Sequence, residues 1–362
     1  QAYTLLTARG GGSASMFAAI ARYSILGALC SCHVESLAVE PWFSSSHGPN
    51  GAIMNFSEAG LCYAAGRGVA PLQRAVEDNW ERIRTNVERG RQQAENMRVI
   101  FAGLIRNAEE SVFRSYAMLK RLGRQFRDYH FILFENDSTD DTAKAMKEIA
   151  QRDSKYEFQT EVLSMGDERG LEASRMERMA TLRNKVHDLV DAFVRRSPGW
   201  DLLVMYDFDL NLIGPDVLSP HVFFGALGRQ ESLDNGWDML CANGLARSCG
   251  PPTCKYGMHD VIAFRGRHNS SWSFDIASVM FDQYELVPVD SCFGGLAMYK
   301  IDKFLGCRYD PEVNECEHVG LHRCMRERGS DGRMFMDPLM TPSYDMFLDL
   351  KCTADASRAR SP

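Results

Sequence analysis

The pattern of apolar and polar positions changes near Met97. After this point, short apolar runs alternate with longer segments whose apolar residues recur every three or four positions. The apolar runs predict strands at 99–105, 131–134, 158–163 and 202–206. The periodic segments predict helices at 108–122, 140–152 and 172–195. This alternation predicts an α/β fold, in which a mostly parallel central sheet is covered by helices on both faces.

Residues 1–95 have a different pattern. Gly-rich and Ser-rich patches come first, and a charged segment at 69–96 follows, in which Trp80, Ile83 and Val87 form the apolar stripe of a predicted helix. We therefore predict three parts: an N-terminal appendage at 1–95, helical from about residue 69, a main domain at 96–345 and a C-terminal tail at 346–362.

Composition excludes several classes of protein. The chain has 362 residues, 45% of them hydrophobic and 25% charged, which is ordinary for a globular protein of one large domain or two smaller ones. Its net charge of −7 argues against a nucleic-acid partner, which would require a broad basic face. The most apolar stretch, 14–30, contains Arg22 and is shorter than the ~20 apolar residues of a membrane span. A membrane anchor would therefore lie outside this chain.

The eleven cysteines leave the cellular compartment open. Cys249 and Cys254 flank a Gly-Pro-Pro loop that a disulfide would close, and Cys307, Cys316 and Cys324 lie close together in the second half of the chain. A Cys-x-x-Cys pair is absent from the sequence, which argues against a structural zinc site.

Polar residues follow three of the predicted strands, at the positions where ligands bind in parallel sheets. Arg106 and Asn107 follow the first strand, residues 135–142 the second, and Asp207-Phe208-Asp209 the fourth. The 135–142 segment is rich in turn formers, so it also fits a plain strand-to-helix turn with a helix cap.

Asp207 and Asp209 lie on the same side of an extended segment, where their charges repel unless a cation lies between them. Such a pair suits Mg²⁺ or Mn²⁺, completed by water and substrate phosphates. Acid pairs of this spacing also occur on surface loops without a function. On the preceding helix, Arg175, Arg183 and Asn184 would face a diphosphate, which guanidinium groups bind in a paired geometry.

These segments, in this order, resemble the GT-A fold glycosyltransferases of the family 2 type, and more distantly the fungal capsule mannosyltransferases and algal or viral sugar transferases. The resemblance covers roughly residues 97–345. It implies that the turn after the second strand holds the nucleotide base through Glu135 or Asp137. The residues implied to bind the nucleotide sugar are Arg106, Asn107, Glu135, Asn136, Asp137, Arg175, Arg183, Asn184 and Asp207.

The resemblance continues in the second half of the chain. Gly294 and Gly295 match a Gly-Gly segment that lines the sugars, and Asp260 would contact the acceptor. Glu317, or as a second choice Glu315, is implied as the catalytic base of an inverting reaction, whereas a retaining reaction needs no such base. A metal site of Asp207, Asp209 and His322, holding Mn²⁺ or Mg²⁺, completes the implied set.

The resemblance thus implies an enzyme, a hexosyl or pentosyl transferase that moves a sugar from a UDP- or GDP-sugar to a hydroxyl of a glycan or other acceptor. The Golgi or secretory lumen is favoured over the cytoplasm by the habits of the family. Two alternatives remain: an inactive nucleotide-sugar-binding protein, and a haloacid dehalogenase-type phosphatase, which also carries D-x-D after a strand.

Overall fold

A computed structural model describes the chain at residues 78–161, 172–208, 220–233, 236–250, 253–258, 260, 262–267, 284–310, 315–340 and 343–345. The chain divides into two compact units, Gln1–Met54 and Asn55–Pro362, and every described residue lies in the second. The predictions for residues 1–77, for Asp209 and for the C-terminal tail lie outside the described residues.

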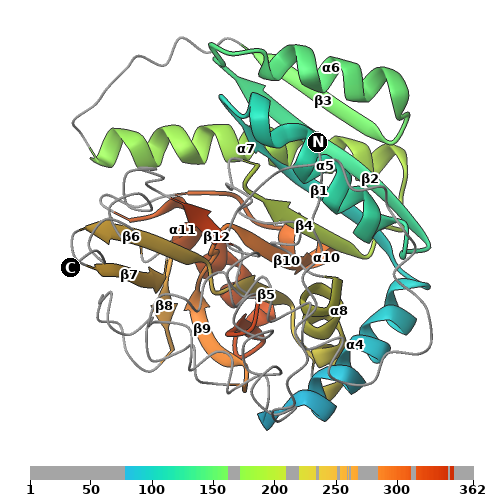
Figure 1. Ribbon diagram of the computed structural model, residues 1–362, viewed down its shortest axis with the longest axis vertical. Coiled ribbons are helices and arrows are strands. Elements are labelled where there is room, and N and C mark those ends of the chain that lie inside the picture. Colours follow the sequence, from blue (N-terminus) through green and yellow to red (C-terminus); the bar gives the residue numbers. More distant parts are fainter. Residues whose placement is uncertain are drawn as a thin grey trace, which may run out of the picture. The chain divides into compact units, whose positions relative to one another are not determined.

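The first half of the described chain alternates strand and helix as the sequence predicts. Its elements are β1 (Arg98–Ile105), α5 (Glu109–Gly123), β2 (Asp128–Asn136), α6 (Thr142–Arg152), β3 (Tyr156–Glu161), α7 (Glu172–Arg196) and β4 (Leu202–Tyr206). The strands pair in the order β3-β2-β1-β4, and all of these pairs are parallel. Their carboxyl ends therefore meet at the same edge of the sheet (Figure 1).

Five more strands extend the sheet beyond β4, in the spatial order β10 (Leu296–Lys300), β5 (Met239–Ala242), β11 (Met334–Asp337), β9 (Val287–Ser291) and β8 (Arg265–Gly266). Among these pairings only β5–β11 is parallel. The α/β class is confirmed, but the sheet is mixed and not mostly parallel. The strand–helix alternation that produces parallel crossovers ends at β4. The prediction of parallel pairing therefore does not hold for the strands beyond β4.

A second, three-stranded sheet is formed by β12 (Ser343–Asp345), β6 (Leu245–Gly250) and β7 (Thr253–Met258). The remaining elements are α4 (Trp80–Ala94), α8 (Pro220–Gly228), η1 (Arg229–Ser232), α10 (Ile301–Phe304), α11 (Glu317–Met325) and η3 (Arg326–Ser330). None of the described helices is long and apolar enough to cross a membrane.

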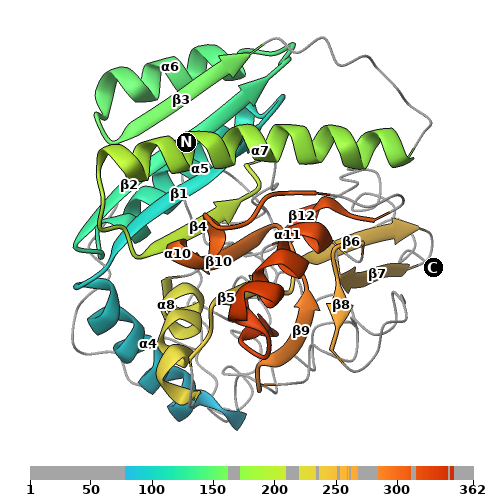
Figure 2. The ribbon, with the colours of Figure 1, turned by 180° about the vertical axis from the view of Figure 1, so that it is seen from behind.

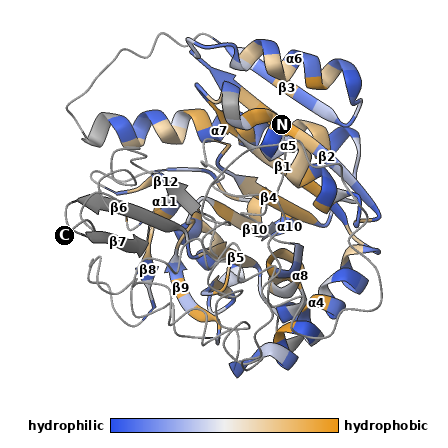
Figure 3. Ribbon diagram, viewed as in Figure 1, coloured by the Kyte–Doolittle hydropathy of each residue, from blue (hydrophilic) through white to orange (hydrophobic). Residues whose placement is uncertain are grey.

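Successive side chains of the sheet point to opposite faces, which creates two hydrophobic cores. On β1, for example, Phe101 packs into the core beneath α5, α6 and α8, while Ile100 packs into the core beneath α7 and α11. In Figure 2, α7 and α11 lie in front of the sheet, and in Figure 1 α5 does. The hydropathy colours show the apolar strands in the middle and polar residues on the outer helices (Figure 3). The prediction of helices on both faces is confirmed.

Helix α4 packs closely against α8. A Cβ at Gly90 would lie 1.9 Å from the carbonyl oxygen of Phe224, and one at Gly228 would lie 1.9 Å from that of Asn86, so only glycine fits at these contacts. Val87 of α4 is buried in the same core as β1. The predicted apolar stripe therefore packs on a neighbour, and that neighbour lies within the predicted main domain.

Among the described residues, disulfides join Cys241 to Cys292 and Cys307 to Cys324, and Cys316 is free and buried. Cys249 and Cys254 lie directly opposite each other on β6 and β7. A disulfide between Cys249 and Cys254 stays a prediction.

Candidate active site

The candidate site lies at the carboxyl ends of β1, β2 and β4. Asn107 and Asp207 follow β1 and β4, and Glu135 lies at the end of β2. The backbone N–H of Asp207 donates to the carbonyl oxygen of Gly295 at 3.0 Å, which attaches the end of β4 to the glycine pair before β10. The parallel register thus places the predicted polar segments at one edge of the sheet, as expected.

The turn between β2 and α6 is held by its own polar groups. The Ser138 N–H donates to Glu135 Oε1 at 2.9 Å, and the Thr139 N–H donates to Asn107 Oδ1 at 2.8 Å. The Asn107 N–H donates to Ser138 Oγ at 3.0 Å. Asn107 and Asp137 have φ of 49° and 50°, a region that Asn and Asp tolerate better than most residues. The turn is therefore a fixed structure before any ligand binds.

The side chains predicted to bind the nucleotide differ in accessibility around this turn. Glu135 and Asn136 are buried, and the Asn136 amide lies 3.3 Å from a carboxylate oxygen of Asp137. Arg106 is exposed. Their contacts with a nucleotide remain predictions.

Arg183 of α7 is the centre of the site. Its Nε donates to Glu317 Oε1 at 2.8 Å, its Nη2 lies 3.5 Å from Asp207 Oδ1, and the guanidinium lies 4.8 Å from the ring centroid of Phe293. The residue is only 5% exposed. Burial opposes the charge, but the two carboxylates outweigh it and hold the pKa of Arg183 well above its ordinary value. Its Nη1 has no hydrogen-bond partner among the described residues.

The two candidate base residues, Glu317 and Glu315, are separated by the start of α11. Glu317 is the first residue of the helix and is buried, whereas Glu315 lies before the helix and pairs with Arg323. The thiol of Cys316 donates to Glu317 Oε2 at 3.3 Å, so both oxygens of Glu317 are engaged. Of the two, the structure brings only Glu317 to Arg183.

Asp260 joins this cluster from a different part of the chain. The backbone N–H groups of Gly294 and Ala263 face its carboxylate. Burial and the nearby charge of Glu317 raise the pKa of Asp260 to about 6, although Arg183 and these two N–H groups act in the opposite direction.

The predicted glycine pair shapes the backbone between Asp207 and Asp260. Gly294 and Gly295 have φ of 64° and 81°, values that glycine adopts without strain. A Cβ at Gly294 would lie 2.2 Å from the carbonyl oxygen of Ala242. The pair is thus required by the backbone, whatever it contacts in a ligand.

Two site residues were not predicted, His318 and Tyr309. The imidazole of His318 stacks on Phe293, with ring centroids 4.1 Å apart, and Tyr309 contacts it edge-on at 5.5 Å. Both are buried, and neither the imidazole nitrogens nor the Tyr309 hydroxyl has a hydrogen-bond partner among the described residues. Burial and the charge of Arg183 keep the pKa of His318 well below its ordinary value. The only sequence signal for His318 was its position beside Glu317.

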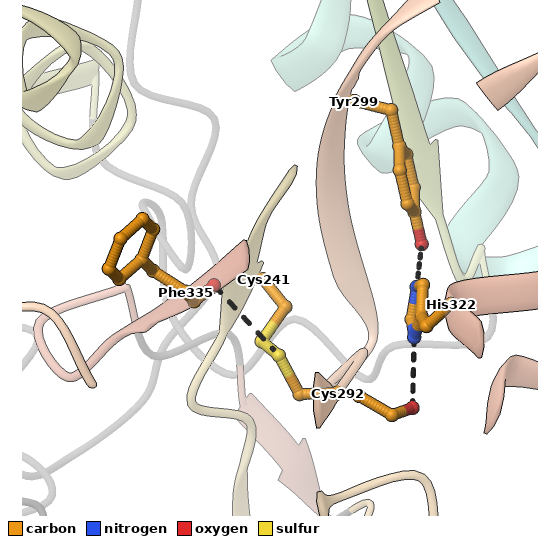
Figure 4. The surroundings of a disulfide bond; sticks show 6 residues. Cys241, Cys292, Tyr299, His322 and Phe335 are labelled. Atoms are coloured by element: carbon orange, nitrogen blue, oxygen red, sulfur yellow. Dashed lines mark hydrogen bonds between the residues drawn. A yellow bond between two sulfur atoms is a disulfide. The ribbon is translucent and has the colours of Figure 1, made fainter. Parts of the chain in front are cut away.

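The geometry argues against His322 as a metal ligand. Its Nδ1 lies 2.9 Å from Ser291 Oγ and its Nε2 lies 3.1 Å from the Tyr299 hydroxyl (Figure 4). The residue is fully buried, and burial lowers its pKa to about 3. Both nitrogens are engaged inside the core, near the Cys241–Cys292 disulfide, so His322 has a structural role here.

Asn184 and Arg175 of α7, both predicted to bind the diphosphate, lie in different surroundings. The Asn184 side-chain amide donates to the Tyr309 carbonyl at 2.8 Å and accepts from the Tyr309 N–H at 3.1 Å, so both of its ends hold the backbone. Arg175 is exposed, and its contact with a diphosphate stays a prediction. Arg183 is the residue of this helix that is shown to contact the carboxylates described above.

The predicted metal ion fits the site in part. Asp207 supplies a carboxylate, the ligand type that Mg²⁺ and Mn²⁺ prefer, and its side chain is 22% exposed at the end of β4. Within the part of the chain that the structure describes, no group of three or more His, Cys, Asp or Glu side chains is arranged to hold a metal. Asp207 is therefore the predicted ligand that the structure places at this edge, and the metal site stays a prediction.

No family model matches the chain, and the search of curated proteins finds no match. Among solved structures, the chain is similar to the mannosyltransferase PcManGT from Pyrobaculum calidifontis, solved with GDP-Man and Mn²⁺, at 12% identity and a TM-score of 0.37, covering 80% of this chain and 75% of that one. It is also similar to glucosyl-3-phosphoglycerate synthase from Mycobacterium tuberculosis, solved with Mn²⁺, UDP and phosphoglyceric acid, at 14% identity and a TM-score of 0.37, covering 76% and 79%.

A third similar structure is S. aureus TarS 1–349, at 12% identity and a TM-score of 0.37. The match covers 69% of this chain and 60% of that chain. With TM-scores of 0.37, these likenesses assign no role to any residue of this chain.

Proposed function

We propose that the chain is a glycosyltransferase that moves a sugar from a nucleoside diphosphate donor, UDP- or GDP-linked, to a hydroxyl of a glycan or other acceptor. The observation that supports this most is the position of Arg183 at the carboxyl ends of the parallel strands. There a buried guanidinium contacts Asp207 and Glu317, and its Nη1 has no hydrogen-bond partner among the described residues. A phosphate oxygen would complete its hydrogen bonds.

Two features of the reaction correspond to this cluster. The departing diphosphate carries negative charge, which the fixed charge of Arg183 would stabilise without reorganising. Glu317 and Asp207 hold that guanidinium in place. Mn²⁺ or Mg²⁺, when bound, would add positive charge at the diphosphate, and Asp207 is the described residue that would hold it.

The two alternatives fit less well. A haloacid dehalogenase-type phosphatase carries its acid pair on the first strand of the domain, whereas here β1 is followed by Arg106 and Asn107, and Asp207 follows β4. An inactive binding protein would not need three carboxylates close to the buried arginine. Turnover separates these alternatives.

The secretory lumen is the compartment that we propose. The disulfides Cys241–Cys292 and Cys307–Cys324 support it, because disulfides persist in oxidising compartments and are rare in the cytosol. Lumenal glycan hydroxyls are then the natural acceptors.

The test is a panel of UDP- and GDP-sugars with Mn²⁺, in which release of free nucleoside diphosphate is measured with and without a glycan acceptor. We expect turnover with at least one donor and a loss of about 100-fold or more in Asp207→Asn, since the metal and phosphate site is removed. Asp201→Asn is the matched control, because Asp201 lies just before the same strand, is 44% exposed and accepts the Arg98 N–H.

Donor binding without turnover would favour the inactive binding protein. Release of phosphate from simple phosphomonoesters, dependent on Asp207, would favour the phosphatase. Equal activities of Asp207→Asn and Asp201→Asn would contradict the assignment of Asp207 to the active site.

A further inference from the structure

The site brings together three carboxylates in different surroundings. Asp207 contacts Arg183 at the end of β4, and Glu317 is held by Arg183 on one oxygen and by the Cys316 thiol on the other. Asp260 receives the backbone N–H groups of Gly294 and Ala263, and Arg183 acts on it through its charge. The three are therefore not equivalent as proton acceptors.

Glu317 is poorly placed to take a proton from a substrate. It is 4% exposed, and protonation would remove the negative charge that faces the buried guanidinium of Arg183 at 2.8 Å. A buried charge that loses a partner is strongly destabilised, because its desolvation is no longer offset. Each turnover would meet that cost if Glu317 were the base.

Asp260 meets the requirements better. Asp260 is only partly buried as a residue, unlike Glu317, and the Gly294 N–H fixes its carboxylate beside the glycine pair. Among the described residues, the charged groups that act on it are Glu317 of α11 and Arg183 of α7, and its own charge acts on the Cys316 thiol and the Tyr299 hydroxyl. With a pKa of about 6, its carboxylate is ionised at neutral pH yet more basic than an ordinary Asp, as a general base should be.

We propose that Asp260, and not Glu317, accepts the proton of the acceptor hydroxyl, while Glu317 is a positioning residue that fixes Arg183. This assignment rests on the proposed transferase function. The acceptor O–H bond breaks as its oxygen forms a bond to the anomeric carbon of the sugar. The bond from that carbon to the diphosphate oxygen breaks, and the electron pair leaves with the nucleoside diphosphate. The proton passes to Asp260 and then to solvent.

The pH dependence of sugar transfer tests this assignment. In the unsubstituted protein, the transfer rate should fall about tenfold per pH unit below about pH 6, because Asp260 becomes protonated there. In Asp260→Asn, the transfer rate should fall by about 10²–10⁴-fold, and the decrease in rate below about pH 6, the acid limb of the pH–rate profile, should disappear. The affinity for the nucleoside diphosphate should change by less than about threefold. Asp331→Asn is the control, because the Asp331 side chain is 60% exposed. It should leave the transfer rate and its pH profile unchanged.

Glu317→Gln separates the two candidates. Glutamine can still accept the hydrogen bond from Arg183 Nε, but it removes a charge that raises the pKa of Asp260. The acid limb should therefore persist and move to lower pH, with partial loss of transfer. If Glu317 were the base, the acid limb of the pH–rate profile would disappear in Glu317→Gln, and the transfer rate would fall by as much as is expected here for Asp260→Asn.

The failures of the two proposals are distinguishable. If no nucleotide sugar is bound or turned over, the transferase function fails and the role of Asp260 with it. If the unsubstituted protein transfers sugar and Asp260→Asn keeps transfer within about threefold with its acid limb intact, only the role of Asp260 is overturned.

Discussion

The turn between β2 and α6 and the cluster around Arg183 lie at the same end of the sheet, but they are held by different kinds of bond. In the turn, neutral backbone N–H groups donate to side chains such as Glu135 and Asn107, partly at the exposed surface. In the cluster, the buried charges of α7 and α11 and the partly exposed carboxylate of Asp207, which follows β4, meet across 24 to 134 residues of sequence. The bonds of the turn join residues 3 to 32 positions apart in sequence, whereas Arg183 and Glu317 of the cluster are 134 positions apart.

This difference affects how each region should respond to substitution. An exposed hydrogen bond contributes about 0.5–1.5 kcal/mol and can be replaced by water. A buried charge cannot be replaced in this way, because water does not reach it and the remaining partner keeps its desolvation cost. Substitutions in the cluster should therefore be costly and coupled, and those in the turn small and independent.

The largest effect is expected for Arg183→Met. Methionine keeps much of the side-chain volume but leaves Asp207 and Glu317 without their cation, so the free energy of unfolding should fall by about 3–5 kcal/mol. Arg195→Met is the control on the same helix, since Arg195 is 77% exposed and pairs with Asp191 one turn away. It should cost less than about 1 kcal/mol in urea unfolding. Similar losses in both variants would show that the cluster is no more coupled than the surface.

Gly294→Ala should have the next largest effect. The new Cβ would lie 2.2 Å from a backbone oxygen at a φ of 64°, so strain and displacement of the chain should together cost about 2–4 kcal/mol. Gly329→Ala is the matched control, because its φ is 99° but no atom lies within 4 Å of the added Cβ. It should cost about 1–2 kcal/mol, from backbone strain alone. If the two variants unfold at the same urea concentration, the close approach at Gly294 is not a constraint.

The fold was largely predictable where strands and helices alternate. Apolar runs and helical periodicity located β1 to β4 and α5 to α7 to within a few residues, because both are local properties of the sequence. The strands after β4 could not be ordered, since antiparallel pairings such as β4 with β10 depend on contacts 90 or more residues apart in sequence. Local patterns do not contain that information.

The candidate site, like the fold, was predictable only in part from the sequence. Arg183, Asp207 and Glu317 were predicted separately and do meet. Asn184 and His322 have the residue types of binding groups, but the completed fold uses both ends of each side chain internally. Residue type and spacing could not show this, because their partners lie elsewhere in the chain.

The smallest effect is expected in the turn, from Asn107→Gly. Glycine keeps the φ of 49° without strain but removes the oxygen that accepts the Thr139 N–H, so stability should fall by about 1 kcal/mol. Asn107→Asp keeps an acceptor oxygen and should lose less. Combined with Glu317→Gln, the cost of Asn107→Gly should add within about 0.5 kcal/mol, as for independent sites. A larger coupling in this double-mutant cycle would contradict the independence of the turn and the cluster, and would mean that binding at one alters the other.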